Sequence, residues 1–95
     1  MAKTPSGLFQ FKVPDEVVGV IRSLHPDLKR KIKMAFKIII NNPDAGKSLR
    51  DELIGLKSFR VGRLRILYRI KGRNIEIVAI GPRRNIYQET YRLLR

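Results

Sequence analysis

The sequence predicts a single α+β domain in which a helix hairpin packs on one face of a small antiparallel sheet. Three observations lead to this prediction: an alternating apolar segment near the start, two stretches with helical apolar spacing, and three short β-prone stretches separated by glycine-containing turns. The predicted order is β-α-α-β-β-β, followed by a short C-terminal helix. A chain of 95 residues supports one hydrophobic core. We therefore expect residues 1–95 to form one domain, with residues 1–7 flexible.

The first half of the chain is expected to hold one strand and the helix hairpin. Residues 9–13 alternate apolar and polar side chains, as a strand with one buried face does. Pro14 has a backbone angle suited to a helix start, and apolar residues repeat at helical spacing from Val17 to Leu24. The His25-Pro26-Asp27 stretch interrupts this pattern. A second apolar stripe then runs from Leu28 until it is stopped by Asn41-Asn42-Pro43.

The second half is expected to form an antiparallel meander. Residues 42–56 are rich in turn-forming side chains and predict irregular structure with at most one helical turn. Glycines 62 and 72 supply the turns between the three β-prone stretches. These stretches are 58–61, 64–70 and 74–80, and residues 87–94 are expected to form the C-terminal helix.

Alternation across the meander places arginines on the face opposite the helix hairpin. Arg65, Leu67 and Arg69 share one face of their strand, whereas Tyr68 belongs to the apolar face and is expected in the core. A hairpin that turns at Gly62-Arg63 sets Arg60 beside Arg65. Two like charges this close favour an anion between them, so we expect this uncovered face to carry the function.

Charge and composition restrict the function classes. The formal net charge is +13, and residues 57–95 carry eleven basic side chains, nine of them arginine, against only Glu76 and Glu89. This excess favours a polyanion or an acidic protein as partner. The chain has no cysteine, no apolar run long enough to cross a membrane and no signal-peptide pattern, so we expect a cytoplasmic protein without membrane contact.

Several chemistries find no support in the residues. There is no Cys/His cluster for zinc, no glycine-rich phosphate loop and no Ser-His-Asp arrangement, so we expect neither a metal nor another cofactor. The one histidine, His25, lies between the two predicted helices. We interpret it as a capping residue at a turn.

The residues of the meander resemble the signature of the RelE/ParE superfamily of bacterial toxins. The resemblance is carried by the stretch Ser58 to Ile70, which reads SFRVGRLRILYRI, by Ile80-Gly81-Pro82-Arg83 and by Tyr87. Upstream, Leu24-His25-Pro26, Asn42-Pro43 and Leu53-Ile54-Gly55-Leu56 are similar to the same family. The resemblance therefore covers nearly the whole chain.

The RelE-like branch is favoured, and it implies a toxin of a type II toxin–antitoxin system. Such enzymes cleave messenger RNA on the ribosome without a metal, using a nucleotide's own 2′-hydroxyl as nucleophile, and so inhibit translation. The resemblance also implies an antitoxin partner, for which we expect an acidic segment, besides mRNA and the ribosome. The expected catalytic residues are Arg60, Arg65, Arg83 and Tyr87, and the expected RNA-binding residues are Lys57, Arg63, Arg69 and Arg84.

Two other interpretations stay open. A ParE-like toxin would share the fold and inhibit DNA gyrase by binding, without RNA-cleaving residues. A non-catalytic basic RNA-binding domain would explain the charge but not the Gly-Arg-Leu-Arg and Gly-Pro-Arg motifs. Tyr87 itself has an alternative role, in which its ring packs on the sheet and its hydroxyl faces water.

Overall fold

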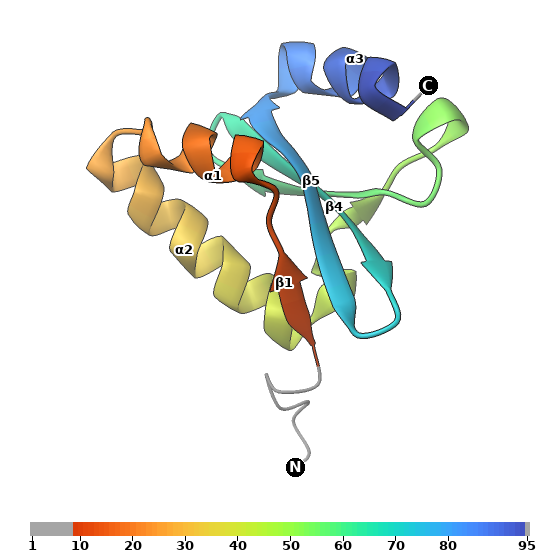
Figure 1. Ribbon diagram of the computed structural model, residues 1–95, viewed down its shortest axis with the longest axis horizontal. Helices are drawn as coiled ribbons and strands as arrows, with labels where there is room; N and C mark the ends of the chain where they lie inside the picture. The colour runs from red at the N-terminus through yellow and green to blue at the C-terminus, as the bar shows by residue number, and fades with distance from the viewer. Residues whose placement is uncertain (1–8, 95) are drawn as a thin grey trace.

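A five-stranded sheet lies between a helix hairpin on one face and a C-terminal helix on the other (Figure 1). The computed structural model describes residues 9–94, and within these the side chains of all but 52, 83–85, 89, 93 and 94. The predicted flexibility of residues 1–7 concerns a segment outside the described residues. The helices are α1 (Asp15–Arg22), α2 (Pro26–Asn41) and α3 (Arg83–Leu94), and the strands are β1 (Gln10–Lys12), β2 (Lys47–Ser48), β3 (Lys57–Val61), β4 (Leu64–Lys71) and β5 (Asn74–Pro82).

The α+β class and the order of elements are confirmed. The strand order across the sheet is β1-β5-β4-β3-β2, and β3, β4 and β5 form the predicted antiparallel meander. The N-terminal strand joins the other side of the meander and runs parallel to β5, so the sheet is mixed at that edge. The predicted irregular segment 42–56 holds two short 3₁₀ turns, η2 (Pro43–Ala45) and η3 (Asp51–Leu53), and the two-residue strand β2.

The helix boundaries follow from local chemistry. Pro14 and Pro26 stand at the starts of α1 and α2, where a missing backbone N–H leaves no hydrogen bond unmade. The Nδ1 atom of His25 accepts a hydrogen bond from the backbone N–H of Asp27 at 3.1 Å. His25 is therefore the N-cap of α2, as its position in the sequence predicts.

The core lies between the helix hairpin and one face of the sheet. Phe11 and Phe36 pack with ring centroids 4.8 Å apart and so join β1 to α2. No helix among residues 9–94 is long and apolar enough to cross a membrane. The buried core residues are Val17, Ile32, Ala35, Ile39, Val61, Ile66, Tyr68, Ile75, Ile77 and Ile80.

The two meander turns need left-handed backbone conformations. Gly62 and Gly72 have φ angles of 59° and 60°, which cost a glycine little because it has no Cβ atom. Within β5 the pairing with β4 skips Val78, since Leu67 pairs with Ala79 and Tyr68 with Ile77. This bulge lets Ile77 and Ile80 both face the core although they are three residues apart.

Tyr68 connects the core to the irregular segment that follows α2. Its side chain is fully buried, and its hydroxyl donates to the carbonyl of Pro43 at 2.7 Å and accepts from the N–H of Gly46 at 2.9 Å. Burial raises the pKa of the Tyr68 hydroxyl above its ordinary value. The hydroxyl therefore stays protonated at neutral pH and keeps its donor role.

Replacing Tyr68 by phenylalanine should lower the free energy of unfolding by about 1–3 kcal/mol, because one buried N–H and one carbonyl lose their partner. The change is measured by urea denaturation. Hydrogen exchange provides a local readout, since the Gly46 amide should exchange faster in Tyr68→Phe. An unchanged midpoint and an unchanged Gly46 exchange rate would contradict this role of the hydroxyl.

Candidate functional site

The β3–β4 hairpin brings two arginines side by side on the face away from α1 and α2. Arg60 pairs directly with Arg65 across the two strands, as the sequence predicts. Arg60 is exposed and Arg65 is half-buried. The only hydrogen bond described for either guanidinium runs from Arg60 Nε to the Gly62 carbonyl, at 3.3 Å. Neither arginine forms an ion pair within the described side chains.

Directly opposed like charges destabilise a sheet unless something lies between them. An arginine presents planar N–H donors suited to phosphate oxygens, and two adjacent arginines present two such groups. The Arg60–Arg65 pair is therefore a candidate anion site. It lies close to the two-residue turn, where the hairpin holds both side chains on one face.

Helix α3 covers the part of this face that the sequence analysis left open. The buried residues on this side are Ser58 and Leu67 of the sheet and Ile86 and Thr90 of α3. The expectation of an uncovered face is thus wrong next to Leu67, whose side chain is fully buried. The reason is that α3 begins at Arg83 rather than at residue 87 and runs back across β5 and β4. Pro82 ends β5 immediately before it.

Tyr87 is held over β3 by a hydroxyl pair. Its Oη atom lies 3.2 Å from Oγ of Ser58, and either atom can be the donor. Ser58 is buried and stands two residues before Arg60, on the same face of β3. The Tyr87 hydroxyl therefore lies at Ser58, on the face of β3 that also carries Arg60. Ser58 is not among the predicted site residues, although its alternation with Arg60 along the strand was the available signal.

Arg83 and Arg84 form the first turn of α3, and their side chains lie outside the part of the chain that the structure describes. Their backbone follows closely on Gly81, which is the partner of Arg65 in the sheet. The expected catalytic residues Arg60, Arg65 and Tyr87 thus come from β3, β4 and α3, and Arg83 begins the helix that carries Tyr87.

Two of the expected RNA-binding residues, Arg69 and Lys57, lie apart from the arginine pair. Arg69 donates from Nε to Glu76 Oε1 at 2.6 Å, four residues along β4 from Arg65. Lys57 lies on the helix side of β3, where its Nζ atom contacts Ser48 Oγ at 3.1 Å and Asp44 Oδ1 at 3.5 Å. Arg63 occupies the exposed turn between β3 and β4. Arg69 and Lys57 therefore already have anionic partners within the chain.

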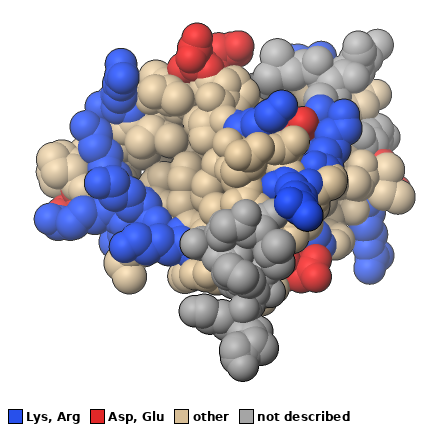
Figure 2. All heavy atoms as spheres, turned by 60° about the horizontal axis from the view of Figure 1, so that its bottom comes forward, with Lys and Arg blue, Asp and Glu red and all other residues tan. Residues whose placement is uncertain are grey.

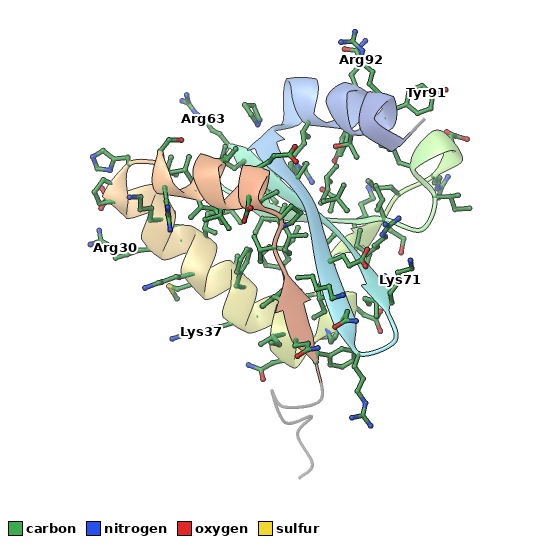
Figure 3. The ribbon with its side chains drawn as sticks, viewed as in Figure 1. Arg30, Lys37, Arg63, Lys71, Tyr91 and Arg92 are labelled. Carbon is green, nitrogen blue, oxygen red and sulfur yellow. The ribbon has the colours of Figure 1, made fainter. Side chains whose placement is uncertain are left out.

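Basic side chains also cover a second surface, formed by α2. Figure 2 shows a band of Lys and Arg on the side of the molecule where α1 and α2 lie, and Figure 3 shows Arg30 and Lys37 pointing outward from α2. The exposed basic residues of α2 are Arg30, Lys31, Lys33 and Lys37.

Among the described residues, no group of three or more His, Cys, Asp or Glu side chains could hold a metal ion.

The sequence and the fold were compared with those of known proteins. The profile of a family described as the ParE toxin of type II toxin–antitoxin systems, parDE, matches residues 19–87. No curated protein matches the sequence.

Solved structures of several toxins have the same fold. The chain is similar to the toxin–antitoxin complex RelBE2 from Mycobacterium tuberculosis, with 28% identity and a TM-score of 0.68 over 79% of this chain and 91% of that one. The RelE–RelB complex of Pyrococcus horikoshii is 23% identical, with a TM-score of 0.66 over 80% of this chain and 96% of that one. The isolated RelE toxin of E. coli is 14% identical, with a TM-score of 0.68 over 92% of this chain and 99% of that one. The last two likenesses support the fold alone.

If Arg60 and Arg65 form an anion site, millimolar sulfate should raise the melting temperature more than sodium chloride of equal ionic strength does. Binding at ten times the dissociation constant contributes about 1.4 kcal/mol to stability. Arg65→Ala should lose this sulfate-specific increment. Arg73→Ala, which removes an exposed arginine from the β4–β5 turn, should keep it. Equal increments in both variants would show that sulfate acts elsewhere.

The Arg69–Glu76 pair should make part of the stability dependent on pH. The hydrogen bond from Arg69 lowers the pKa of the Glu76 carboxyl below its ordinary value of 4.5. A lowered pKa in the folded state stabilises the protein fully above that ordinary value, and this contribution disappears as the pH falls through the folded-state pKa. Urea denaturation between pH 7 and pH 3 should therefore show a smaller acid loss for Glu76→Gln than for the wild type. An equal loss of unfolding free energy on acidification in both proteins would contradict the Arg69–Glu76 pairing.

Proposed function

Because the chain belongs to the ParE toxin family of type II toxin–antitoxin systems, within the RelE/ParE superfamily, we propose that it inhibits translation as a ribosome-dependent, metal-free mRNA endoribonuclease. The observation that carries this proposal is the Arg60–Arg65 pair, with the Ser58–Tyr87 hydroxyl pair on the same face of the sheet. The similarity to the RelBE2 complex agrees with the RelE-like branch. Such an enzyme acts in the cytoplasm, where ribosomes are.

The proposed reaction needs no group from outside the RNA and the protein. The 2′-hydroxyl oxygen of one nucleotide forms a bond to the phosphorus of its own 3′-phosphate, and the bond from that phosphorus to the 5′-oxygen of the next nucleotide breaks. The 2′-hydroxyl loses its proton and the departing 5′-oxygen gains one. The products are a cyclic 2′,3′-phosphate and a free 5′-hydroxyl, so atoms and charge balance.

Charge develops on the non-bridging phosphate oxygens during this step. The sheet register places Arg60 and Arg65 on neighbouring strands before substrate arrives, so we propose that both guanidinium groups bind those oxygens. Arg83, at the first turn of α3, is the third proposed cation. Arg63 and Arg84 are proposed to contact neighbouring RNA phosphates. We assign no RNA contact to Lys57 and Arg69, because their charges are already paired with Asp44 and Glu76.

Tyr87 is the proposed group nearest the moving protons. Its hydroxyl can accept a proton from one neighbour and donate one to another, and it is paired with Ser58, two residues before Arg60 on β3. Positioning on a large partner can raise the rate of modest acid–base groups, because binding converts an encounter between reactants into a step within one complex. We therefore propose that cleavage requires positioning on the ribosome.

An antitoxin is the proposed partner outside catalysis. Two of the structural relatives are complexes of a toxin with its antitoxin. A chain with a net charge of +13 favours a partner with an acidic segment. Ordering of such a segment on the toxin would bury apolar area as well as charge.

A ParE-like inhibitor of DNA gyrase is the second candidate. The family profile that matches residues 19–87 is that of ParE toxins, which favours it. A gyrase inhibitor that acts by binding does not require the Arg60–Arg65 pair or the Tyr87 hydroxyl. The two candidates therefore differ in how they respond to the same substitutions.

Purified protein should cleave a defined message within the decoding site of programmed ribosomes, as read by toeprinting. Arg65→Ala and Arg83→Ala should each lower the cleavage rate by about 10²–10³-fold, which is typical of losing one donor that stabilises developing charge. Arg73→Ala is the matched control and should cleave like the wild type.

Absence of cleavage by folded, antitoxin-free wild type would overturn the nuclease proposal. A gyrase supercoiling assay on the same preparation then tests the second candidate. Inhibition that survives both arginine substitutions would establish the ParE-like activity.

A further inference from the structure

A hollow of about 410 Å³ lies on the sheet where β1 ends. Lys12 and Val13 border it at the end of β1, Arg69 borders it from β4, and Glu76 and Val78 border it from β5. Its volume falls in the range of cavities that bind small molecules, and its lining combines apolar side chains with a few charged ones, as such sites commonly do. The hollow is therefore a candidate site for a small organic ligand.

Helix α3 separates this hollow from the arginine pair. Arg69 stands four residues from Arg65 on β4, a distance of about 13 Å at the usual rise of a strand. Leu67 lies midway between them and is fully buried on the side of the sheet that α3 covers. An RNA strand bound at the arginine pair therefore does not continue along β4 into the hollow. A free small ligand fits the hollow better than a further part of a message.

The backbone of β5 is open beside the hollow. Among the described residues, β1 pairs with β5 only as far as Lys12 and Glu76, because the chain then turns at Pro14 into α1 (Figure 1). On the other side of β5, the bulge leaves Val78 without a partner in β4. Bulges are common next to binding and active sites, where the interrupted ladder leaves backbone groups available to a ligand.

The charged side chains of the hollow form one row across three strands. Lys12 pairs with Glu76 in the sheet register, and Glu76 pairs with Arg69. Arg69 Nε donates to Glu76 Oε1 at 2.6 Å, and no other hydrogen bond of Arg69 is described. This hydrogen bond holds the pKa of the Glu76 carboxyl below its ordinary value, so the group is an ionised acceptor at neutral pH. Each carboxylate oxygen has two lone pairs, so one bond from Arg69 leaves further acceptor sites.

The Arg69–Glu76 pair therefore offers N–H donors followed by two carboxylate oxygens. The Watson–Crick edge of guanine has the complementary order, since the acceptor O6 is followed by the donors N1–H and N2–H₂. Guanine can thus make three hydrogen bonds with the pair, whereas adenine, cytosine and uracil each place only one acceptor next to one donor in the required order. The same pairing that occupies the charge of Arg69 gives it this selective edge.

We propose that this hollow binds a free guanine nucleotide. The Arg69–Glu76 pair holds the Watson–Crick edge of the base, and the faces of the ring pack against the apolar side chains of Val13 and Val78. Lys12 is exposed and has no described ion pair, so its ammonium group binds the phosphate. This binding goes beyond the proposed function, because it uses neither the arginine pair nor the Tyr87 hydroxyl.

The probe is guanosine 5′-monophosphate, titrated at low salt into the full isotope-labelled chain and followed by the NMR shifts of the backbone amides. The amides of Glu76 and Val78 should shift, with a dissociation constant at least about tenfold lower than for the adenosine, cytidine and uridine monophosphates. Glu76→Gln should abolish this preference, because an NH₂ group replaces one acceptor. Asp51→Asn is the matched control and should keep it. Asp51 is an exposed acid that does not line the hollow, and asparagine tolerates its φ angle of 56°.

Two further comparisons separate recognition of the base from attraction of the phosphate. Guanosine should bind more weakly than its monophosphate but keep the preference over adenosine. Lys12→Ala should weaken all four monophosphates to a similar extent and leave the preference for guanine. Equal binding of the four monophosphates, no binding at millimolar concentration, or an unchanged preference in Glu76→Gln would overturn the inference.

A short single-stranded RNA that contains guanine tests whether the occupant is free. It should shift the Glu76 and Val78 amides no more strongly than guanosine monophosphate does at equal guanine concentration. Binding at least about tenfold tighter through the same amides would make the message the occupant and overturn the assignment to a free nucleotide. These titrations need no ribosome, so their outcome is independent of the cleavage assay.

Discussion

The register between β3 and β4 is the constraint on which both faces of the protein depend. Gly62 at φ 59° closes a two-residue turn and sets Arg60 opposite Arg65. The same register places Ile66 and Tyr68 in the core and Leu67 under α3. A slip by one residue would turn each of these side chains to the other face, so the apolar core and the cationic pair form together or not at all. The stability of the core thus keeps two like-charged residues opposite each other on neighbouring strands.

Much of the fold could be predicted because it follows from local patterns. Apolar periodicity located α1 and α2, glycines located the turns, and alternation along β4 assigned Arg65 and Tyr68 to opposite faces. The parallel pairing of β1 with β5 carries no local signal, since it joins residues such as Phe11 and Ile75 that are far apart in sequence. The early start of α3 was hidden because Gly-Pro followed by Arg-Arg is equally typical of a loop.

The sequence predicts the arginine pair of the candidate site, but not the partners that the surrounding side chains find. Strand alternation is sufficient to bring Arg60 and Arg65 together. It cannot show that Arg69 finds Glu76 on the neighbouring strand or that Lys57 meets Asp44 of η2, because those contacts depend on strand order and on the path of an irregular segment. Ser58 was missed for a related reason. A serine on a strand gains a specific role only when another element, here α3 with Tyr87, brings a partner to it.

The parallel pairing of β1 also controls when the protein can finish folding during its own synthesis. β1 leaves the ribosomal exit tunnel well before its partner β5, since Gln10 pairs with Asn74. The chain emerges at roughly 5–20 residues per second, so β1 waits for several seconds with its edge unpaired. Helix α3, which brings Tyr87 to Ser58, emerges later still. The Ser58–Tyr87 hydroxyl pair can therefore form only after β3, β4 and β5 have all left the tunnel, later than the hairpin that carries the arginine pair.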